Sequence, residues 1–232
     1  MRGPQGPSDR NEHVSFFTDY LGDATRQARL LEMSIEHLGL VGASIAVAVV
    51  LGLVLGIVAH RVRWVASTIL NTTSIFLTIP SLALFALLIP VVGIGATPAW
   101  VALIMYSLLP IVRNTVSGLY SVDQAVVESA KGMGMGGMTR LLRIELPNAW
   151  PVILAGVRVA TLLIVGIAAI AALVGGPGLG QEIYQNGIRR IGSPGALHAL
   201  LGGTVMIVLL ALLLDLLYLA IGRLTIPRGI RE

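Results

Sequence analysis

Uncharged apolar runs separated by short charged stretches dominate this chain. The first run covers residues 38–59 and carries no charged side chain over 22 positions. At 1.5 Å of rise per residue, a helix of that length crosses the hydrocarbon core of a bilayer, which is about 30 Å thick. The pattern therefore predicts a first membrane-spanning helix over residues 38–59.

The second uncharged run, residues 64–112, is too long for a single crossing and must be interrupted. We expect one span over about residues 66–91, kinked at Pro80, and another over about residues 99–118. The interruption between these two spans is marked by Gly93, Gly95 and Pro98.

A polar and charged segment, residues 121–147, follows the third expected span and is expected to lie outside the hydrocarbon. Two further apolar stretches predict spans over about residues 151–174 and 197–222. A glycine-rich stretch, residues 175–180, lies between them. The prediction is an all-α membrane protein with five transmembrane helices and a cytoplasmic loop of two short helices.

The composition supports a membrane protein and excludes several other classes. Hydrophobic residues make up 55% of the 232 positions, charged residues only 12%, and the chain contains no cysteine. A soluble domain would carry about 25% charged residues, and a disulfide or thiolate-metal scaffold needs cysteine. We divide the chain into a polar N-terminal extension, residues 1–33, expected to be extracytoplasmic, and a transmembrane domain, residues 34–232, that includes the 121–147 loop.

The distribution of basic residues predicts the orientation in the membrane. The loops on one side of the expected spans carry few basic residues: none around Gly95, and two, Arg189 and Arg190, before the last span. Cytoplasmic loops are enriched in Lys and Arg, so the basic side is expected to be cytoplasmic, with the N-terminus outside and the C-terminus inside the cell membrane. The basic side carries Arg61, Arg63, Arg113, Lys131, Arg140, Arg143, Arg223, Arg228 and Arg231.

The 121–147 segment contains a long, multi-point motif. It reads Glu128-Ser129-Ala130, three residues, Gly134, nine residues, then Ile144-Glu145-Leu146-Pro147. This resembles the E-A-A, x3, G, x9, I-x-L-P signature of permease subunits of binding-protein-dependent ABC importers. The conserved positions thus fall on Glu128, Ser129, Ala130, Gly134, Ile144, Leu146 and Pro147, and Ser129 stands where the family usually has Ala.

The residues themselves predict a compact knob in this segment. A helix is expected over residues 122–131, glycines break it, and a second helix is expected from about Thr139 until Pro147 stops or redirects the chain. In the permease family that this motif resembles, the knob docks in a groove of a cytoplasmic ATPase dimer, and the ATPase binds the ATP. Glu128 is then expected to position the first helix; the alternative is a solvated loop whose acid pairs with a nearby Arg.

Four other pieces resemble one branch of these permeases, the quaternary-amine or osmoprotectant group. The resemblance implies inward transport of glycine betaine, choline, carnitine or proline betaine, with an extracytoplasmic solute-binding protein and a second permease copy or a sister permease. A methionine-type permease is the nearest alternative, and a secondary carrier without an ATPase is a third possibility. The pieces are residues 78–83, 109–115, 175–180 and 225–229, where Gly176 and Pro177 replace the Ala and Gly of the family pattern.

Charged and polar residues inside the expected spans are further candidates. Arg158 and Asp215 lie at a similar depth, and a lone charge in hydrocarbon is costly, so we expect either an ion pair or separate snorkelling of the two groups. Hydroxyl groups near the expected kink are candidates for the lining of the translocation path, or else for contacts between helices and to free carbonyls. These path candidates are Thr72, Thr73, Thr78, Pro80 and Ser81.

The search for enzymatic sites gives a negative expectation. The chain has no G-x-x-x-x-G-K-[ST] phosphate-binding loop, and its four His residues have no H-x-x-x-H spacing. A membrane-bound enzyme is a further possible class, but no set of catalytic groups can be assembled on one face of the spans. We therefore expect a transport subunit without a catalytic site, metal, cofactor or nucleic-acid partner of its own, surrounded by membrane lipid.

Overall fold

The computed structural model describes residues 22–193 and 195–226, and within these ranges it is built of helices joined by short turns. Residues 227–229 of the last motif, together with Arg228 and Arg231, lie outside the described residues. The α-helices are α1 (Ala24–Arg61), α2 (Arg63–Thr78), α3 (Ser81–Val92), α4 (Ala96–Tyr120), α5 (Gln124–Gly132), α6 (Gly137–Arg140), α7 (Leu146–Ile170) and α8 (Ala196–Thr225). Short π or 3-10 turns are η2 (Leu141–Glu145), η3 (Ala171–Val174), η4 (Glu182–Gly187) and η5 (Ile188–Arg190).

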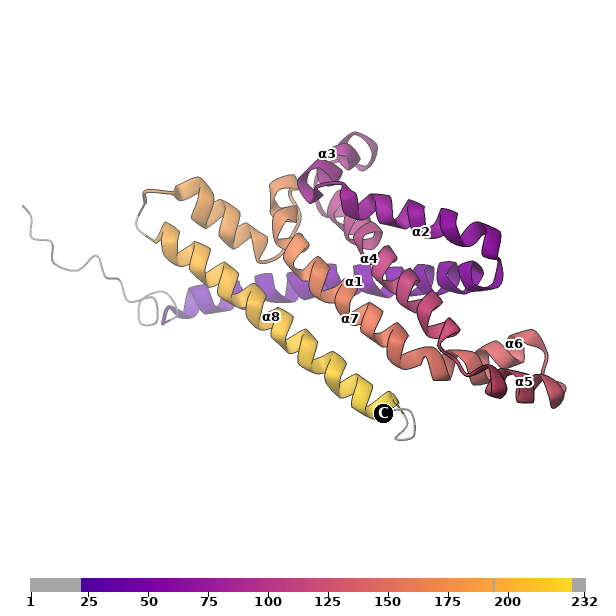
Figure 1. The fold of residues 1–232 in the computed structure, drawn as a ribbon. Coiled ribbons are helices and arrows are strands. Elements are labelled where there is room, and N and C mark those ends of the chain that lie inside the picture. The colour runs from indigo at the N-terminus through magenta and orange to yellow at the C-terminus, as the bar shows by residue number, and fades with distance from the viewer. Residues whose placement is uncertain (1–21, 194, 227–232) are drawn as a thin grey trace, which may run out of the picture.

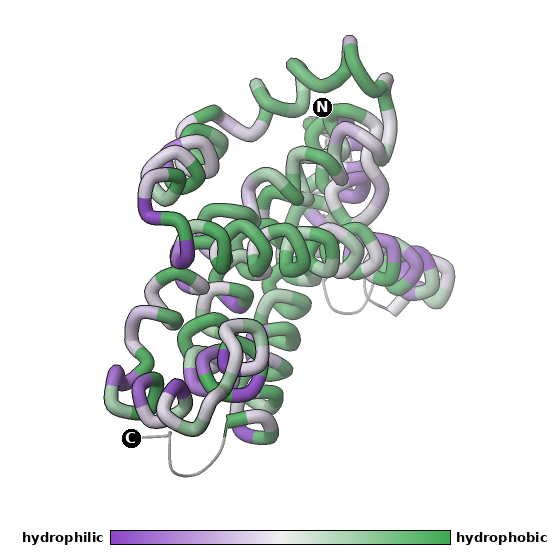
Figure 2. The backbone as a smooth tube through the Cα atoms, turned by 90° about the vertical axis from the view of Figure 1, so that its right-hand side faces the viewer, coloured by the Kyte–Doolittle hydropathy of each residue, from purple (hydrophilic) through white to green (hydrophobic). Residues whose placement is uncertain are grey.

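Four of the described helical stretches are long and apolar enough to cross a membrane alone, and the pair α2 and α3 makes a fifth candidate. The four are α1, α4, the continuous stretch Gly137–Val174 that contains α7, and α8. The all-helical membrane fold expected from the sequence is confirmed. In Figure 2, hydrophobic positions follow the lengths of these helices, whereas hydrophilic ones gather toward their ends.

The second expected span is broken instead of mildly kinked. Helices α2 and α3 meet at an angle of 102°. Ile79 has extended backbone angles, as a residue before proline prefers, and Pro80 then caps α3. The Tyr106 hydroxyl of α4 donates a hydrogen bond to the Ile79 carbonyl at 2.7 Å, and this bond pairs a backbone oxygen exposed by the break.

Helix α1 begins well before the expected span. The Asp23 carboxylate accepts a hydrogen bond from the Thr25 N–H at 2.9 Å and caps a helix of 38 residues. Such a helix is about 57 Å long, more than the 40–45 Å of a bilayer with its headgroups. Residues 24–33, assigned above to the N-terminal extension, are therefore the first turns of the same helix.

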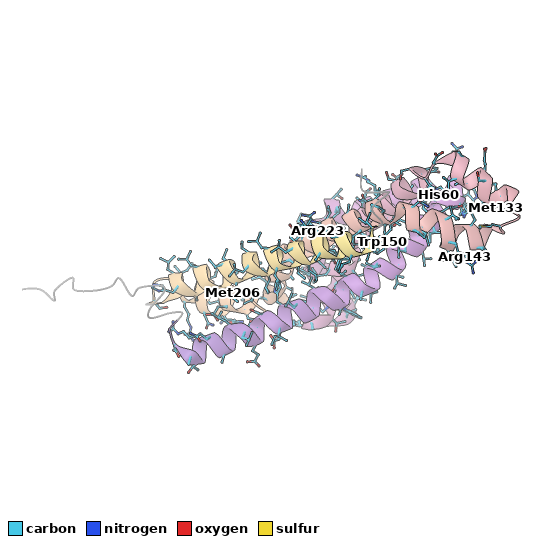
Figure 3. All side chains as sticks on the ribbon, turned by 90° about the horizontal axis from the view of Figure 1, so that it is seen from below. His60, Met133, Arg143, Trp150, Met206 and Arg223 are labelled. Carbon is cyan, nitrogen blue, oxygen red and sulfur yellow. The ribbon has the colours of Figure 1, made fainter. Side chains whose placement is uncertain are left out.

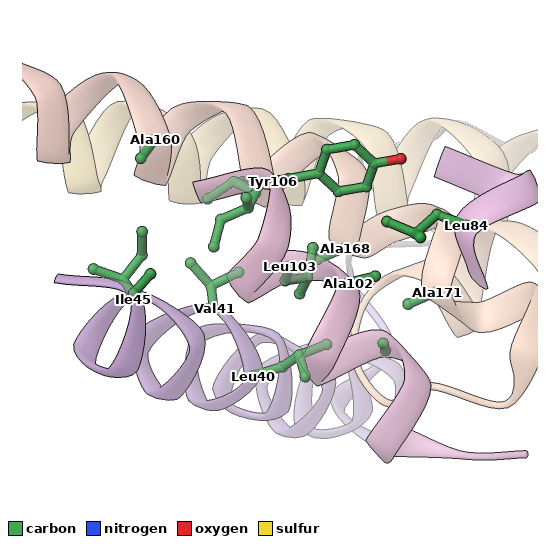
Figure 4. Close-up of a cluster of buried hydrophobic side chains, with 14 of the residues drawn as sticks. Leu40, Val41, Ile45, Leu84, Ala102, Leu103, Tyr106, Ala160, Ala168 and Ala171 are labelled. Atoms are coloured by element: carbon green, nitrogen blue, oxygen red, sulfur yellow. The ribbon is translucent and has the colours of Figure 1, made fainter. Parts of the chain in front are cut away.

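Helices α1, α4 and α7 form the interior of the bundle. Figure 4 shows side chains of all three helices in one apolar cluster, among them Val41 of α1, Leu103 and Tyr106 of α4, and Ala160 of α7. Glycine allows the close approach: a Cβ added at Gly52 would lie 2.6 Å from the Ile111 side chain. Small residues at helix contacts are the usual means of close packing in membranes.

Candidate functional site

The 121–147 segment forms a two-helix projection, with α5 and α6 together at one end of the bundle (Figure 1). The Asp123 carboxylate caps α5 by accepting a hydrogen bond from the Ala125 N–H at 2.8 Å. Val127 and Ala130 of α5 are buried, and Val127 packs on Leu141. Gly134 then takes a positive φ of 79°, which reverses the chain toward α6.

The second half of the segment runs into α7 without interruption, so Pro147 does not stop or redirect the chain as expected. The N–H of Leu146 donates to the carbonyl of Leu141, five residues earlier, which makes this turn a π-helical one. Pro147 follows directly, in the first turn of α7, where the helix tolerates the missing N–H of proline. The wider turn therefore allows one helical path from α6 into the membrane.

The signature residues are divided between two faces of the projection. Glu128 and Ser129 are exposed, and the Ser129 hydroxyl donates to the Ala125 carbonyl at 2.8 Å. Ala130 is buried with 1% exposure. Leu146 is partly buried and packs against the apolar cluster that contains Val127 and Leu141. Exposed Glu128 is thus available to a partner and makes no ion pair shorter than 4.0 Å with a described residue. The remaining signature positions are Gly134 and Pro147, both exposed, and Ile144, which is partly buried.

Glu145 is the functional candidate that the sequence analysis did not single out. Its side chain is 5% exposed, and its two oxygens bind different arginines. Oε2 accepts from Arg61 Nη2 at 2.9 Å, and Oε1 accepts from Arg140 Nε at 2.8 Å. One signal was available in the sequence: an acid directly flanked by Ile144 and Leu146 needs a partner if its apolar neighbours bury it.

The ends of α1 and α4 also meet beside the projection. The rings of His60 and Tyr120 lie edge to face with centroids 4.6 Å apart. Figure 3 shows His60, Met133 and Arg143 at the same end of the molecule. Arg61, the next residue of α1, also lies 3.5 Å from the Gly137 carbonyl through its Nη2 atom. The last turn of α1 is thus held against the projection by polar contacts and against the end of α4 by an aromatic contact.

Arg158 of α7 and Asp215 of α8 form a bidentate ion pair within the expected spans. Arg158 Nε donates to Asp215 Oδ1 at 2.6 Å, and Nη2 donates to Oδ2 at 2.8 Å. Three residues further along both helices, the Thr161 and Tyr218 hydroxyls are 2.8 Å apart. The structure therefore brings together the two charges that the sequence placed at one depth.

The path candidates lie on α2 and at the break that follows it. Thr73 is buried, and its hydroxyl donates within its own helix to the Ile69 carbonyl at 2.9 Å. The exposed Thr78 hydroxyl donates to the Ile75 carbonyl at 2.7 Å. Thr72 and Pro80 are exposed, and Ser81 is partly so. The hydroxyls of Thr73 and Thr78 keep acceptor lone pairs, but their hydrogens are donated to backbone carbonyls.

The glycine-rich stretch lies at the end of the bundle opposite the projection. Gly178 has a φ of 101°, and its N–H donates to the Glu36 carboxylate of α1 at 3.1 Å. The neighbouring His37 is buried, with Nε2 3.1 Å from the Val165 carbonyl of α7. Pro177, which departs from the family pattern, precedes Gly178. Residues 36 and 37 of α1 thus contact this loop and α7.

In the described residues, no group of three or more His, Asp or Glu side chains could hold a metal ion.

Comparison with known proteins shows the family to which the chain belongs. The fold and the two-helix projection define a polytopic membrane subunit of the permease type. The chain belongs to the family of binding-protein-dependent transport system inner membrane components, whose model matches residues 15–228.

Several relatives of the chain are permeases named for one group of solutes. The osmoprotectant import permease protein OsmW of Salmonella typhimurium is 41% identical over 87% of this chain and 94% of its own. The choline transport system permease protein OpuBB of Bacillus subtilis is 36% identical over 90% of this chain and 94% of its own. A chain of the MetNI methionine ABC transporter, in an inward-facing conformation, matches with a TM-score of 0.77 and 25% identity over 88% of this chain and 99% of its own.

Proposed function

We propose that this permease moves a small quaternary-amine osmoprotectant, such as glycine betaine, choline, carnitine or proline betaine, into the cell. The supporting observation is that relatives named for osmoprotectant or choline transport are 36–41% identical over nearly the whole chain. A methionine-like solute is the second candidate, supported by the match to the methionine transporter chain across 88% of this chain.

The 121–147 segment is the proposed contact with a separate cytoplasmic ATPase. Its two short helices project from the bundle, and Glu128 and Ser129 lie on the exposed face. Ala130 lies on the opposite, buried face of α5. A push on the exposed face then moves α4 and α7 together, because the segment joins these helices directly. ATP is bound and hydrolysed in the partner, since this sequence carries no G-x-x-x-x-G-K-[ST] loop.

The orientation follows from the charges at the two ends of the bundle. The end with α5 and α6 carries Arg61, Lys131, Arg140 and Arg143, which favours a cytoplasmic position for the projection. The glycine-rich loop then faces outward, where a solute-binding protein delivers its cargo. A second copy of this chain or a sister permease completes the path, and the α2 hydroxyls near Pro80 are its proposed polar lining.

Uptake in proteoliposomes tests this function. The permease is reconstituted with its ATPase and its binding protein, ATP is enclosed, and labelled glycine betaine, choline, carnitine and methionine are offered singly. We expect ATP-dependent uptake of at least one quaternary amine and little uptake of methionine. Uptake of methionine alone would establish the second candidate. Equal uptake without the ATPase would indicate a carrier and contradict the proposal.

A further inference from the structure

Glu145 lies where three parts of the chain meet. Arg61 is the last residue of α1, Arg140 is the last residue of α6, and Glu145 is the last residue of the π turn that leads into α7. Each carboxylate oxygen accepts one charge-assisted hydrogen bond, at 2.9 Å from Arg61 and 2.8 Å from Arg140. One side chain thus joins α1 to the projection.

The surroundings make this contact stronger than an ordinary surface ion pair. Exposed pairs contribute little because water screens them, but the Glu145 side chain is only 5% exposed, and its partners Arg140 and Arg61 are 13% and 35% exposed. A buried carboxylate that lost a partner would keep its desolvation penalty without compensation. Separation of Glu145 from either arginine is therefore energetically costly, so the carboxylate is expected to stay bound to both as the segment moves.

Helix α1 reaches from this contact to the other end of the bundle. Near its beginning, Glu36 accepts a hydrogen bond from the Gly178 N–H of the glycine-rich loop at 3.1 Å. Glu36 and Arg61 are 25 residues apart on one uninterrupted helix, about 38 Å along its axis. One continuous helix thus connects the Arg61 contact with the loop at the opposite end.

We propose that Glu145 is a positioning residue for energy coupling, because its bond to Arg61 makes α1 move with the 121–147 segment. This inference rests on the proposed function. Helices α4 and α7 are connected to the segment by the chain itself, whereas α1 is joined to it through side chains. Loss of the Arg61 bond should leave ATP hydrolysis and α4–α7 motion in place but release α1.

The first test is a pair of matched arginine substitutions. Arg61→Ala removes the bond to α1 and leaves Glu145 paired with Arg140, so the projection stays folded. Arg63→Ala removes an exposed arginine two residues away and serves as the control. The measurement is solute taken up per ATP hydrolysed in proteoliposomes. We expect this ratio to fall about 5- to 150-fold in Arg61→Ala, the range of ordinary coupling energies, and to stay unchanged in Arg63→Ala.

A covalent tether provides the second test. The chain has no cysteine, so Arg61→Cys combined with Gly137→Cys gives the permease its only two thiols, beside one another and with the Glu145–Arg140 pair intact. We expect the double variant to hydrolyse ATP with little uptake, and a short bis-maleimide to restore uptake by rejoining α1 to the segment. A normal ratio in Arg61→Ala, or no recovery in the tethered variant, would overturn the inference. Absence of ATP-driven uptake by the unaltered complex would instead contradict the proposed function.

Discussion

Helix α8 and the interior helix α4 are both apolar, but they are held in the bundle by different contacts. In the apolar stretch of α4, 61% of the residues are buried, compared with 6% in that of α8. Helix α4 packs closely because its neighbours carry glycine: a Cβ added at Gly156 of α7 would lie 2.5 Å from the Asn114 Cβ of α4. Helix α8 instead keeps most of its leucines exposed.

The contact between α8 and α7 includes two polar pairs. The Arg158–Asp215 ion pair and the Thr161–Tyr218 hydroxyl contact lie one helical turn apart. Lipid chains are as apolar as leucine, so leucines alone do not favour protein over lipid, whereas close packing and polar pairs do. The comparison shows two ways to join helices in a membrane, by backbone proximity and by side-chain chemistry.

The largest effect is expected from breaking the ion pair. Asp215→Asn leaves Arg158 in a membrane span without its carboxylate, and such a charge is costly there. We expect the amount of permease in the membrane to fall several-fold, as measured by immunoblot of membrane fractions. Arg158→Asp combined with Asp215→Arg should restore much of that amount. A double variant as depleted as the single one would show that the pair does not attach α8.

A smaller effect is expected from filling the α4–α7 contact. Gly156→Ala places a methyl group 2.8 Å from the Pro110 carbonyl oxygen of α4, and overpacking of this kind costs about 1–3 kcal/mol. Gly166→Ala is the matched control. Gly166 lies in the same helix, α7, and a Cβ added there would have no atom of a neighbouring element within 4 Å. Thermal unfolding in detergent should show a lower Tm for Gly156→Ala alone. Equal Tm values for the two variants would mean that the close approach of α4 and α7 at Gly156 does not contribute to stability.

The smallest effect is expected at the hydroxyl contact. Tyr218→Phe removes one hydrogen bond, a net loss of about 1 kcal/mol, while the Thr161 hydroxyl still bonds to the Val157 carbonyl at 2.9 Å. Thermal unfolding should show a Tm slightly below that of the unaltered protein. A decrease larger than that of Gly156→Ala would reverse the order predicted here.

The apolar pattern was sufficient to predict the helical class, because an uncharged apolar run of about 20 residues is typical of a transmembrane helix. It could not predict the 102° break between α2 and α3, since a proline is compatible with a mild kink or a complete break and the Tyr106 contact decides between them. The continuous path through Pro147 was also missed, because the π turn before it has no clear sequence signal.

The candidate site was predicted in part. The spacing of Glu128, Ala130 and Gly134 located the projection and its glycine turn, since these features are local in sequence. Glu145 was missed because its partner Arg61 is 84 residues away, and sequence separation hides which basic residue lies beside a buried acid. Arg158 and Asp215 were accessible to reasoning because helix geometry relates position along a span to depth.

The most direct test of the account is whether the projection transmits the energy of ATP. ATP hydrolysis and glycine betaine uptake should be measured together in proteoliposomes that contain the permease, its ATPase and its binding protein, with Glu128 intact or replaced by Glu128→Arg. Reversal of this exposed charge should abolish most uptake, because Glu128 lies on the face proposed to contact the ATPase. Full uptake by the Glu128→Arg variant, or uptake that persists without the ATPase, would contradict the account.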